Sequence, residues 1–221
     1  MKRTVKRNFL AGGILLAVFI LWTVFVQCVD VGQIGPNGTE VGFAAFNALV
    51  HNFTGVHMSL YTVTDWLGLI PVMVCILFAI LGLMQCIKRK SIRKVDGDIL
   101  ILGIYYLLVI CAYLIFEWIP INYRPVLIEG VVEVSYPSST TLLVCSVMFS
   151  LMEQVGRRSR NKGVKAFTLG IGSVFVVFMV VGRLVSGVHW FTDIVGAMLL
   201  STGLFSLYHG CVMLTTMQEK E

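Results

Sequence analysis

The stretch WLGLIPVMVCILFAILGLMQCI, residues 66–87, decides the fold class of this chain. It holds no acidic, basic or histidine side chain, and Gln85 is its one strongly polar residue. A helix needs about 20 mostly apolar residues to cross a hydrocarbon core of roughly 30 Å. These residues therefore predict a membrane-spanning helix.

Five further stretches fit the same description. They cover residues 9–28, 99–118, 137–155, 167–185 and 191–214. The stretch 137–155 is the weakest, because it is short and ends on Glu153 and Gln154. The whole chain is 57% hydrophobic and 13% charged, with a mean hydropathy of +0.86, and a soluble domain of this length could not bury so much apolar surface. We predict an all-α integral membrane bundle of six transmembrane helices, with residues 1–221 forming a single domain.

Basic residues set the expected orientation, because they concentrate in cytoplasmic loops. Six spans place all but two of the 17 Lys and Arg residues on one side, so we expect both termini to be cytoplasmic. The basic groups are Lys2 to Arg7, Lys88 to Lys94, Arg157 to Lys165, and Lys220. The first stretch is too long for a signal peptide and has no small-residue cleavage site, so we expect it to be a retained span.

The cytoplasmic Lys and Arg residues account for the net charge of +5, and they can also bind anionic lipid. We therefore expect the bilayer as a partner and no nucleic acid. The six cysteines lie in or at the ends of apolar stretches without paired spacing, which is typical of small buried hydrophobes. The sequence shows no cluster of metal ligands, and the oligomeric state is not readable from it.

Three segments are expected on the extracytoplasmic side: about residues 29–65, 117–140 and 182–192. In the first, residues 41–53 have helix-like apolar spacing, which suits either a helix lying flat at the interface or a loop helix packed on the bundle. The other two segments carry the two exceptional basic residues, Arg124 and Arg183. Topology does not require a positive charge there, and charges near the membrane are costly unless they are paired or functional.

The residues around these arginines suit an anion. Pro137 fits the first position of a helix, and residues 138–141 supply hydroxyl groups beside its unpaired N–H groups. Such a helix start binds phosphate, and guanidinium groups grip phosphate oxygens in pairs. His189 and Asp193 are four residues apart, so on a helix the carboxylate can accept the Nδ1 proton and leave Nε2 free as a nucleophile or base.

At these residues the sequence resembles the type 2 phosphatidic acid phosphatase superfamily, the six-span lipid phosphatases related to glucose-6-phosphatase and vanadium haloperoxidases. The family's motifs are Lys-x6-Arg-Pro, Pro-Ser-Gly-His and Ser-Arg-x5-His-x3-Asp. The third is nearly intact over residues 182–193, with Gly182 in place of the serine. The first keeps Arg124-Pro125, and the second keeps Pro137-Ser138.

The resemblance implies a role for each matching residue. His189 is the expected nucleophile, which becomes phosphohistidine, and Asp193 the carboxylate that orients it. Arg124 and Arg183 are expected to hold the equatorial oxygens of the transition state, where electrostatic stabilisation counts most. Ser138 and the backbone N–H groups that follow it, at Ser139 and Thr140, are the remaining expected phosphate donors. This chemistry requires no metal or cofactor.

Two positions depart from the family pattern. Glu117 stands where the first motif has lysine, and Thr140 where the second has the histidine that protonates the leaving oxygen. Losing a general acid costs about 10² to 10⁴ in rate. An alkoxide needs that proton and a departing phosphate does not, so the departure favours a lipid diphosphate such as undecaprenyl diphosphate over phosphatidic acid. Alternatively, a carboxyl group supplies the proton; Glu117, Glu129 and Glu133 are the candidates.

The leading prediction is a multi-pass cell-membrane enzyme that hydrolyses a lipid phosphate or diphosphate at the extracytoplasmic face. Three alternatives stay open. The first is a phosphotransferase that passes the phosphoryl group to an acceptor lipid. The second is a pseudoenzyme that binds lipid phosphate without turnover. The third is an unrelated six-span channel or transporter.

Overall fold

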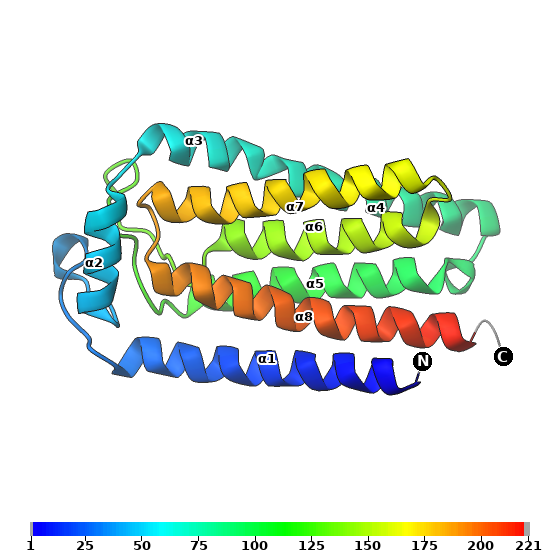
Figure 1. Cartoon of the computed structure of the whole chain (residues 1–221), viewed down its shortest axis with the longest axis horizontal. Helices are drawn as coiled ribbons and strands as arrows, with labels where there is room; N and C mark the ends of the chain where they lie inside the picture. The colour runs from blue at the N-terminus through cyan, green and yellow to red at the C-terminus, as the bar shows by residue number, and fades with distance from the viewer. Residues whose placement is uncertain (1, 219–221) are drawn as a thin grey trace.

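The computed structural model describes residues 2–218 and is helical, with no strand among those residues. Figure 1 shows long helices lying side by side, with a short helix across one end. Within residues 2–218, six helical segments are long and apolar enough to span a membrane, as predicted. They are α1 (Lys2–Cys28), α3 with α4 (Met58–Leu67 and Leu69–Arg89), α5 (Gly97–Trp118), α6 (Ser139–Arg158), α7 (Lys162–Val185) and α8 (Phe191–Gln218).

Several helices extend beyond their predicted ends. The first starts at Lys2 instead of residue 9, and the second at Met58 instead of residue 66. Hydropathy marks only the part that fits the hydrocarbon, whereas backbone hydrogen bonds continue into the polar interface. The extension α3 places Thr64 and Asp65 on a helix, where sequence reasoning expected a loop. Lys220, counted with the basic groups, lies outside the described residues.

The fourth span is apolar only in part because it lies at the centre of the bundle. Its polar residues Ser146, Ser150 and Gln154 are fully buried and follow one another at four-residue spacing, which puts them on one face. Tyr106 shares a hydrogen bond of 2.9 Å with the Ser150 hydroxyl, and Gln154 donates one of 2.8 Å to Tyr208. The weak hydropathy of residues 137–155 therefore reflects a polar seam between helices.

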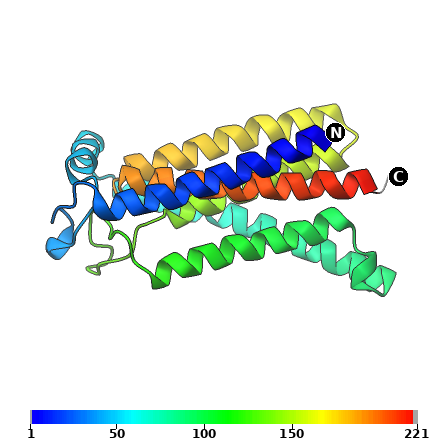
Figure 2. The ribbon, with the colours of Figure 1, turned by 90° about the horizontal axis from the view of Figure 1, so that it is seen from below.

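The two ends of the bundle differ. The basic residues gather at the end where α4 leads into α5 and α6 into α7, here called the basic end. There Asp96 accepts hydrogen bonds from Arg89 and Arg158. Although burial acts to raise the pKa of Asp96, these bonds hold it below its ordinary value. Figure 2 shows the start of α1 and the end of α8 at this end.

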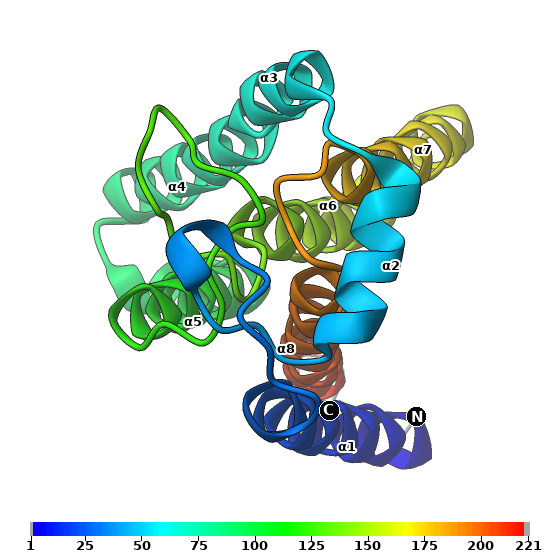
Figure 3. The ribbon, with the colours of Figure 1, turned by 90° about the vertical axis from the view of Figure 1, so that its left-hand side faces the viewer.

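The opposite end, here called the loop end, is covered by the short helix α2 (Ala44–Thr54) and by the two long connections. Figure 3 looks onto it and shows α2 crossing the ends of the spans. Asn47 of α2 is fully buried and donates a hydrogen bond of 3.0 Å to Thr192 at the start of α8. For residues 41–53, the structure therefore shows a loop helix packed on the bundle. Phe53 and Leu49 of this helix are exposed.

Candidate functional site

His189 lies in the short turn between α7 and α8, at the loop end of the bundle. Gly187 makes this turn possible, because it has a positive φ of 73° and a side chain there would lie 2.2 Å from the Gly55 carbonyl oxygen. The turn is also tied to the start of α3 by a hydrogen bond of 3.0 Å from His57 N to the Ser186 carbonyl. These contacts fix the position from which the imidazole projects.

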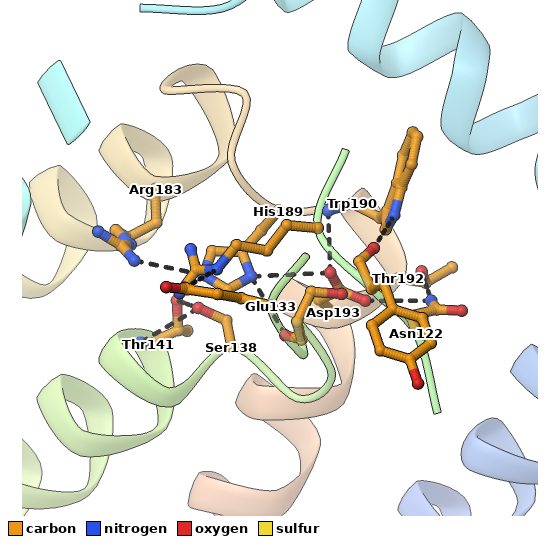
Figure 4. A network of polar contacts seen from close by, with 12 residues as sticks. Asn122, Glu133, Ser138, Thr141, Arg183, His189, Trp190, Thr192 and Asp193 are labelled. Atoms are coloured by element: carbon orange, nitrogen blue, oxygen red, sulfur yellow. Dashed lines mark hydrogen bonds and ion pairs between the residues drawn. The ribbon is translucent and has the colours of Figure 1, made fainter. Parts of the chain in front are cut away.

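The hydrogen bonds of His189 define its tautomer. Nδ1 lies 3.1 Å from the Ser135 carbonyl oxygen, which can only accept, so Nδ1 carries the proton. Nε2 lies 3.3 Å from Arg183 Nη2 and 3.5 Å from Arg124 Nη1, and guanidinium groups can only donate. Nε2 therefore presents a lone pair between two positive charges. Figure 4 shows the Arg183 side chain on one side of the His189 ring.

Burial and charge keep this imidazole neutral. The His189 side chain is almost completely buried, and burial lowers the pKa of His189 well below its ordinary value. The guanidinium groups of Arg124 and Arg183 lower that pKa further, because a second positive charge beside them is unfavourable. A neutral imidazole with a free Nε2 is the form that can act as a nucleophile.

Arg183 enters the site from the last turn of α7 and is 1% exposed. Its guanidinium stacks over the Tyr61 ring at 5.0 Å and donates a hydrogen bond of 3.5 Å to the Thr64 hydroxyl. Asp65 Oδ1 lies 3.7 Å from Arg183 Nη1. Three residues of α3 therefore support the arginine, while its Nη2 is the atom that approaches His189.

Arg124 comes from the connection between α5 and α6, which folds back on itself as a hairpin. The turn is formed by Glu129 and Gly130, both with positive φ, and Arg124 N donates a hydrogen bond of 2.9 Å to the Glu133 carbonyl. The Glu133 carboxylate lies 2.9 Å from Arg124 Nε, as an ion pair without an aligned hydrogen bond. Each of the two arginines therefore has one acidic residue within 4 Å, Glu133 for Arg124 and Asp65 for Arg183.

Asp193 lies next to His189 but does not make its closest contact. Its Oδ2 is 3.7 Å from Nδ1, compared with 3.1 Å for the Ser135 carbonyl, and the same oxygen accepts a hydrogen bond of 2.9 Å from Trp190 N. The carboxylate therefore caps the start of α8 as well as facing the imidazole. The four-residue spacing predicted the proximity, but His189 precedes the helix and its Nδ1 points to a backbone carbonyl.

A buried amide network holds Asp193 in place, and sequence reasoning missed it. Asn122 Nδ2 donates a hydrogen bond of 3.2 Å to Asp193 Oδ1, and its backbone carbonyl accepts one of 2.9 Å from Ser135 N. Asn122 therefore links the carboxylate to the segment whose carbonyl holds His189. Its place two residues before Arg124 is the only sequence signal that it offers.

The start of α6 differs from the prediction. Pro137 precedes the helix, which begins at Ser139, and the fully buried Ser138 is its N-cap. The Ser138 hydroxyl donates a hydrogen bond to the Thr141 hydroxyl, and the Ser138 backbone N–H donates one of 3.2 Å to the Asp193 carbonyl. Both hydrogen-bond donors of Ser138 therefore have partners within the protein. Ser139 and Thr140 remain in the first turn, where N–H groups have no partner within the helix.

Thr140 and Ser139 face a mainly apolar cleft of about 330 Å³ between α4, α5 and α6. Asp65 and Tyr113 also line it. Glu117 lies apart from the arginines, at the exposed end of α5, and lines a separate small cavity with Ser135 and Tyr136. The structure thus brings Arg124, Arg183, His189 and Asp193 together and leaves Glu117 at the edge.

This arrangement can bind an oxyanion and attack it. Two guanidinium groups converge on one nitrogen lone pair, and an anion held between them would lie directly in front of Nε2. Charge developing on that anion would be stabilised without moving either arginine.

The comparisons with known proteins give one family. The family model of the PAP2 superfamily matches residues 72–216. The fold is similar to the crystal structure of a transmembrane PAP2-type phosphatidylglycerolphosphate phosphatase from Bacillus subtilis, with a TM-score of 0.60 and 20% sequence identity over 92% of this chain and 96% of that one. No curated protein matches the sequence significantly.

Proposed function

Because this chain belongs to the PAP2 superfamily, we propose that it is a membrane phosphatase that hydrolyses a lipid phosphate or lipid diphosphate through a phosphohistidine on His189. The observation that carries the proposal is the lone pair of His189 Nε2, flanked by Arg183 at 3.3 Å and Arg124 at 3.5 Å. Phosphoryl transfer needs a positioned nucleophile and positive charge around the equatorial oxygens, and these three side chains supply both.

The reaction proceeds in two steps. Nε2 attacks phosphorus, and the bond to the lipid oxygen, or to the terminal bridging oxygen of a diphosphate, breaks. The Nδ1 proton stays on its hydrogen bond to the Ser135 carbonyl, which stabilises the phosphorylated ring. Water then attacks phosphorus, phosphate leaves, and the neutral imidazole returns. The guanidinium groups hold the phosphoryl oxygens through both steps.

The lipid part of the substrate fits the cleft between α4, α5 and α6. This cleft is mostly apolar, and its polar end holds Asp65, Ser139 and Thr140, with Asp65 lying 3.7 Å from Arg183. An acyl or polyprenyl chain can lie there while its phosphate reaches His189. Because the chain comes from the bilayer, which is as apolar as the cleft, the cleft orients the lipid and contributes little hydrophobic free energy.

We propose that the site lies on the extracytoplasmic side of the membrane. It lies at the loop end, and the basic clusters lie at the opposite end, which the charge rule assigns to the cytoplasm. Both termini would then be cytoplasmic, and the substrate would come from the outer leaflet.

Purified protein should be assayed for phosphate release from a panel that includes phosphatidic acid and undecaprenyl diphosphate. We expect turnover by the wild type and none by His189→Ala. His209→Ala, at the other end of α8, is the matched control and should remain active. Turnover that survives His189→Ala would contradict the proposal, and so would binding without turnover on every lipid. Phosphate appearing on an acceptor lipid instead of in solution would identify a phosphotransferase.

A further inference from the structure

When the substrate is a lipid monophosphate, the departing alkoxide oxygen needs a proton, and Thr140 cannot supply one at neutral pH. The lipid is the leaving group, so its oxygen would lie where the polar end of the apolar cleft approaches Arg183. A proton donor for that oxygen must therefore line the polar end of the cleft. This geometric condition decides which carboxyl group near the site can be the proton donor.

Asp65 is the carboxyl group that meets the condition. It lines the cleft together with Thr140, and its Oδ1 lies 3.7 Å from Arg183 Nη1. Gly68, one turn further on, faces Thr140 closely, since a methyl group added to Gly68 would lie 3.6 Å from Thr140 Cγ2. The end of α3 therefore lies directly opposite position 140.

The other acidic residues do not meet the condition. Glu133 pairs with Arg124, not with Arg183, and it does not line the cleft. Glu117 lines the separate cavity beside Ser135 and Tyr136 and forms no ion pair with either arginine. Glu129 forms the tip of the hairpin.

We propose that Asp65 is the general acid of the reaction, delivering from α3 the proton that the family histidine would deliver from position 140. This inference rests on the proposed phosphatase function. When Nε2 attacks phosphorus and the P–O bond to the lipid breaks, the lipid oxygen takes the proton from the Asp65 carboxyl group. In the second step, water attacks the phosphohistidine and gives a proton back to the Asp65 carboxylate, which restores the starting state.

The surroundings of Asp65 suit this cycle. It lies beside the positive charge of Arg183 from α7, and it lines the cleft together with Tyr113 from α5 and with Ser139 and Thr140 from α6. Tyr61 of its own helix stacks on Arg183. The Asp65 side chain is 61% exposed and is free to turn from Arg183 to the leaving oxygen.

The test compares two lipid phosphates of equal chain length, one with an alkyl and one with a nitrophenyl leaving group. An alkoxide needs a proton and a nitrophenolate does not. We expect Asp65→Asn to lower the alkyl rate by about 10² or more and the nitrophenyl rate by less than about tenfold. Adding Thr140→His to Asp65→Asn should restore the alkyl rate, and Asp65→Glu should keep most of it.

Glu133→Gln is the control for removing a carboxylate from an arginine, and it should change the two rates by the same factor. Equal losses on both substrates in Asp65→Asn, or no loss on either, would overturn the assignment of Asp65 alone. Inactivity of the wild type towards both substrates would instead overturn the proposed function. The Asp65→Glu variant shows whether position 65 tolerates change.

Discussion

Arg183 Nη2 lies 3.3 Å from His189 Nε2, and its other amino group, Nη1, lies 3.7 Å from Asp65 Oδ1. One buried guanidinium thus joins the proposed nucleophile to the proposed proton donor. An anion bound to it would be flanked by both groups, which is the arrangement needed for attack on one side of phosphorus and departure on the other.

Arg183→Lys should lower kcat/KM by about 10² to 10³. Lysine keeps one positive charge, but it cannot contact His189, Thr64 and Asp65 from a single planar group. Steady-state kinetics with a lipid phosphate would measure the loss. Arg93→Lys, an exposed residue at the basic end, is the matched control. Equal rates in the two variants would contradict a role of Arg183 in holding the phosphate.

The lowered pKa of His189 predicts a pH dependence of stability. As pH falls below about 6.5, the unfolded chain binds a proton at this histidine and the folded protein does not. The free energy of unfolding should therefore decrease as pH falls through that value. His189→Asn binds no proton in either state, so its unfolding temperature should fall less than that of the wild type between about pH 7 and pH 5. Parallel curves would show that His189 titrates normally.

Gly187→Ala should destabilise the protein by about 1–3 kcal/mol. The added methyl group would lie 2.2 Å from the Gly55 carbonyl oxygen, and φ of 73° is unfavourable for alanine. Thermal unfolding in detergent would measure the loss. Gly170→Ala, within α7 and with no atom within 4 Å of the new methyl group, should cause no loss. A wild-type unfolding temperature for Gly187→Ala would contradict the tight turn described here.

Asn122→Ala should lower kcat about threefold to tenfold, the value of one ordinary hydrogen bond, and leave KM nearly unchanged. Asn122 contacts Asp193 at 3.2 Å and reaches neither cleft nor arginine, so it positions the carboxylate without binding substrate. The separate measurement of kcat and KM distinguishes these roles. Asn52→Ala, exposed on α2, is the control. A change confined to KM would place Asn122 in contact with substrate.

The six spans and the cluster of Arg183, His189 and Asp193 could be predicted, because both depend on local signals. Apolar length marks a span, and residues 183–193 are close in the chain. Arg124 was found indirectly, as a positive charge that topology did not require. Each of these signals can be read from the sequence without knowing how the helices pack.

The remaining parts of the site depend on tertiary contacts that leave no pattern in the sequence. The group that holds His189 Nδ1 is the backbone carbonyl of Ser135, which any residue could supply. Asp65 looked like the polar end of a loop, because hydropathy stops at residue 66 although the helix begins at Met58. Ser138 looked like a phosphate ligand, but it caps its own helix and is fully buried.

The central claim is that His189 carries the phosphoryl group, and trapping it is the most direct test. Wild-type protein would be mixed with a lipid phosphate labelled with ³²P, quenched during turnover, and analysed for protein-bound label. The account predicts a label that is stable in alkali, labile in acid, located on His189, and absent from His189→Ala. Turnover without any such label, or a label on another residue, would contradict it.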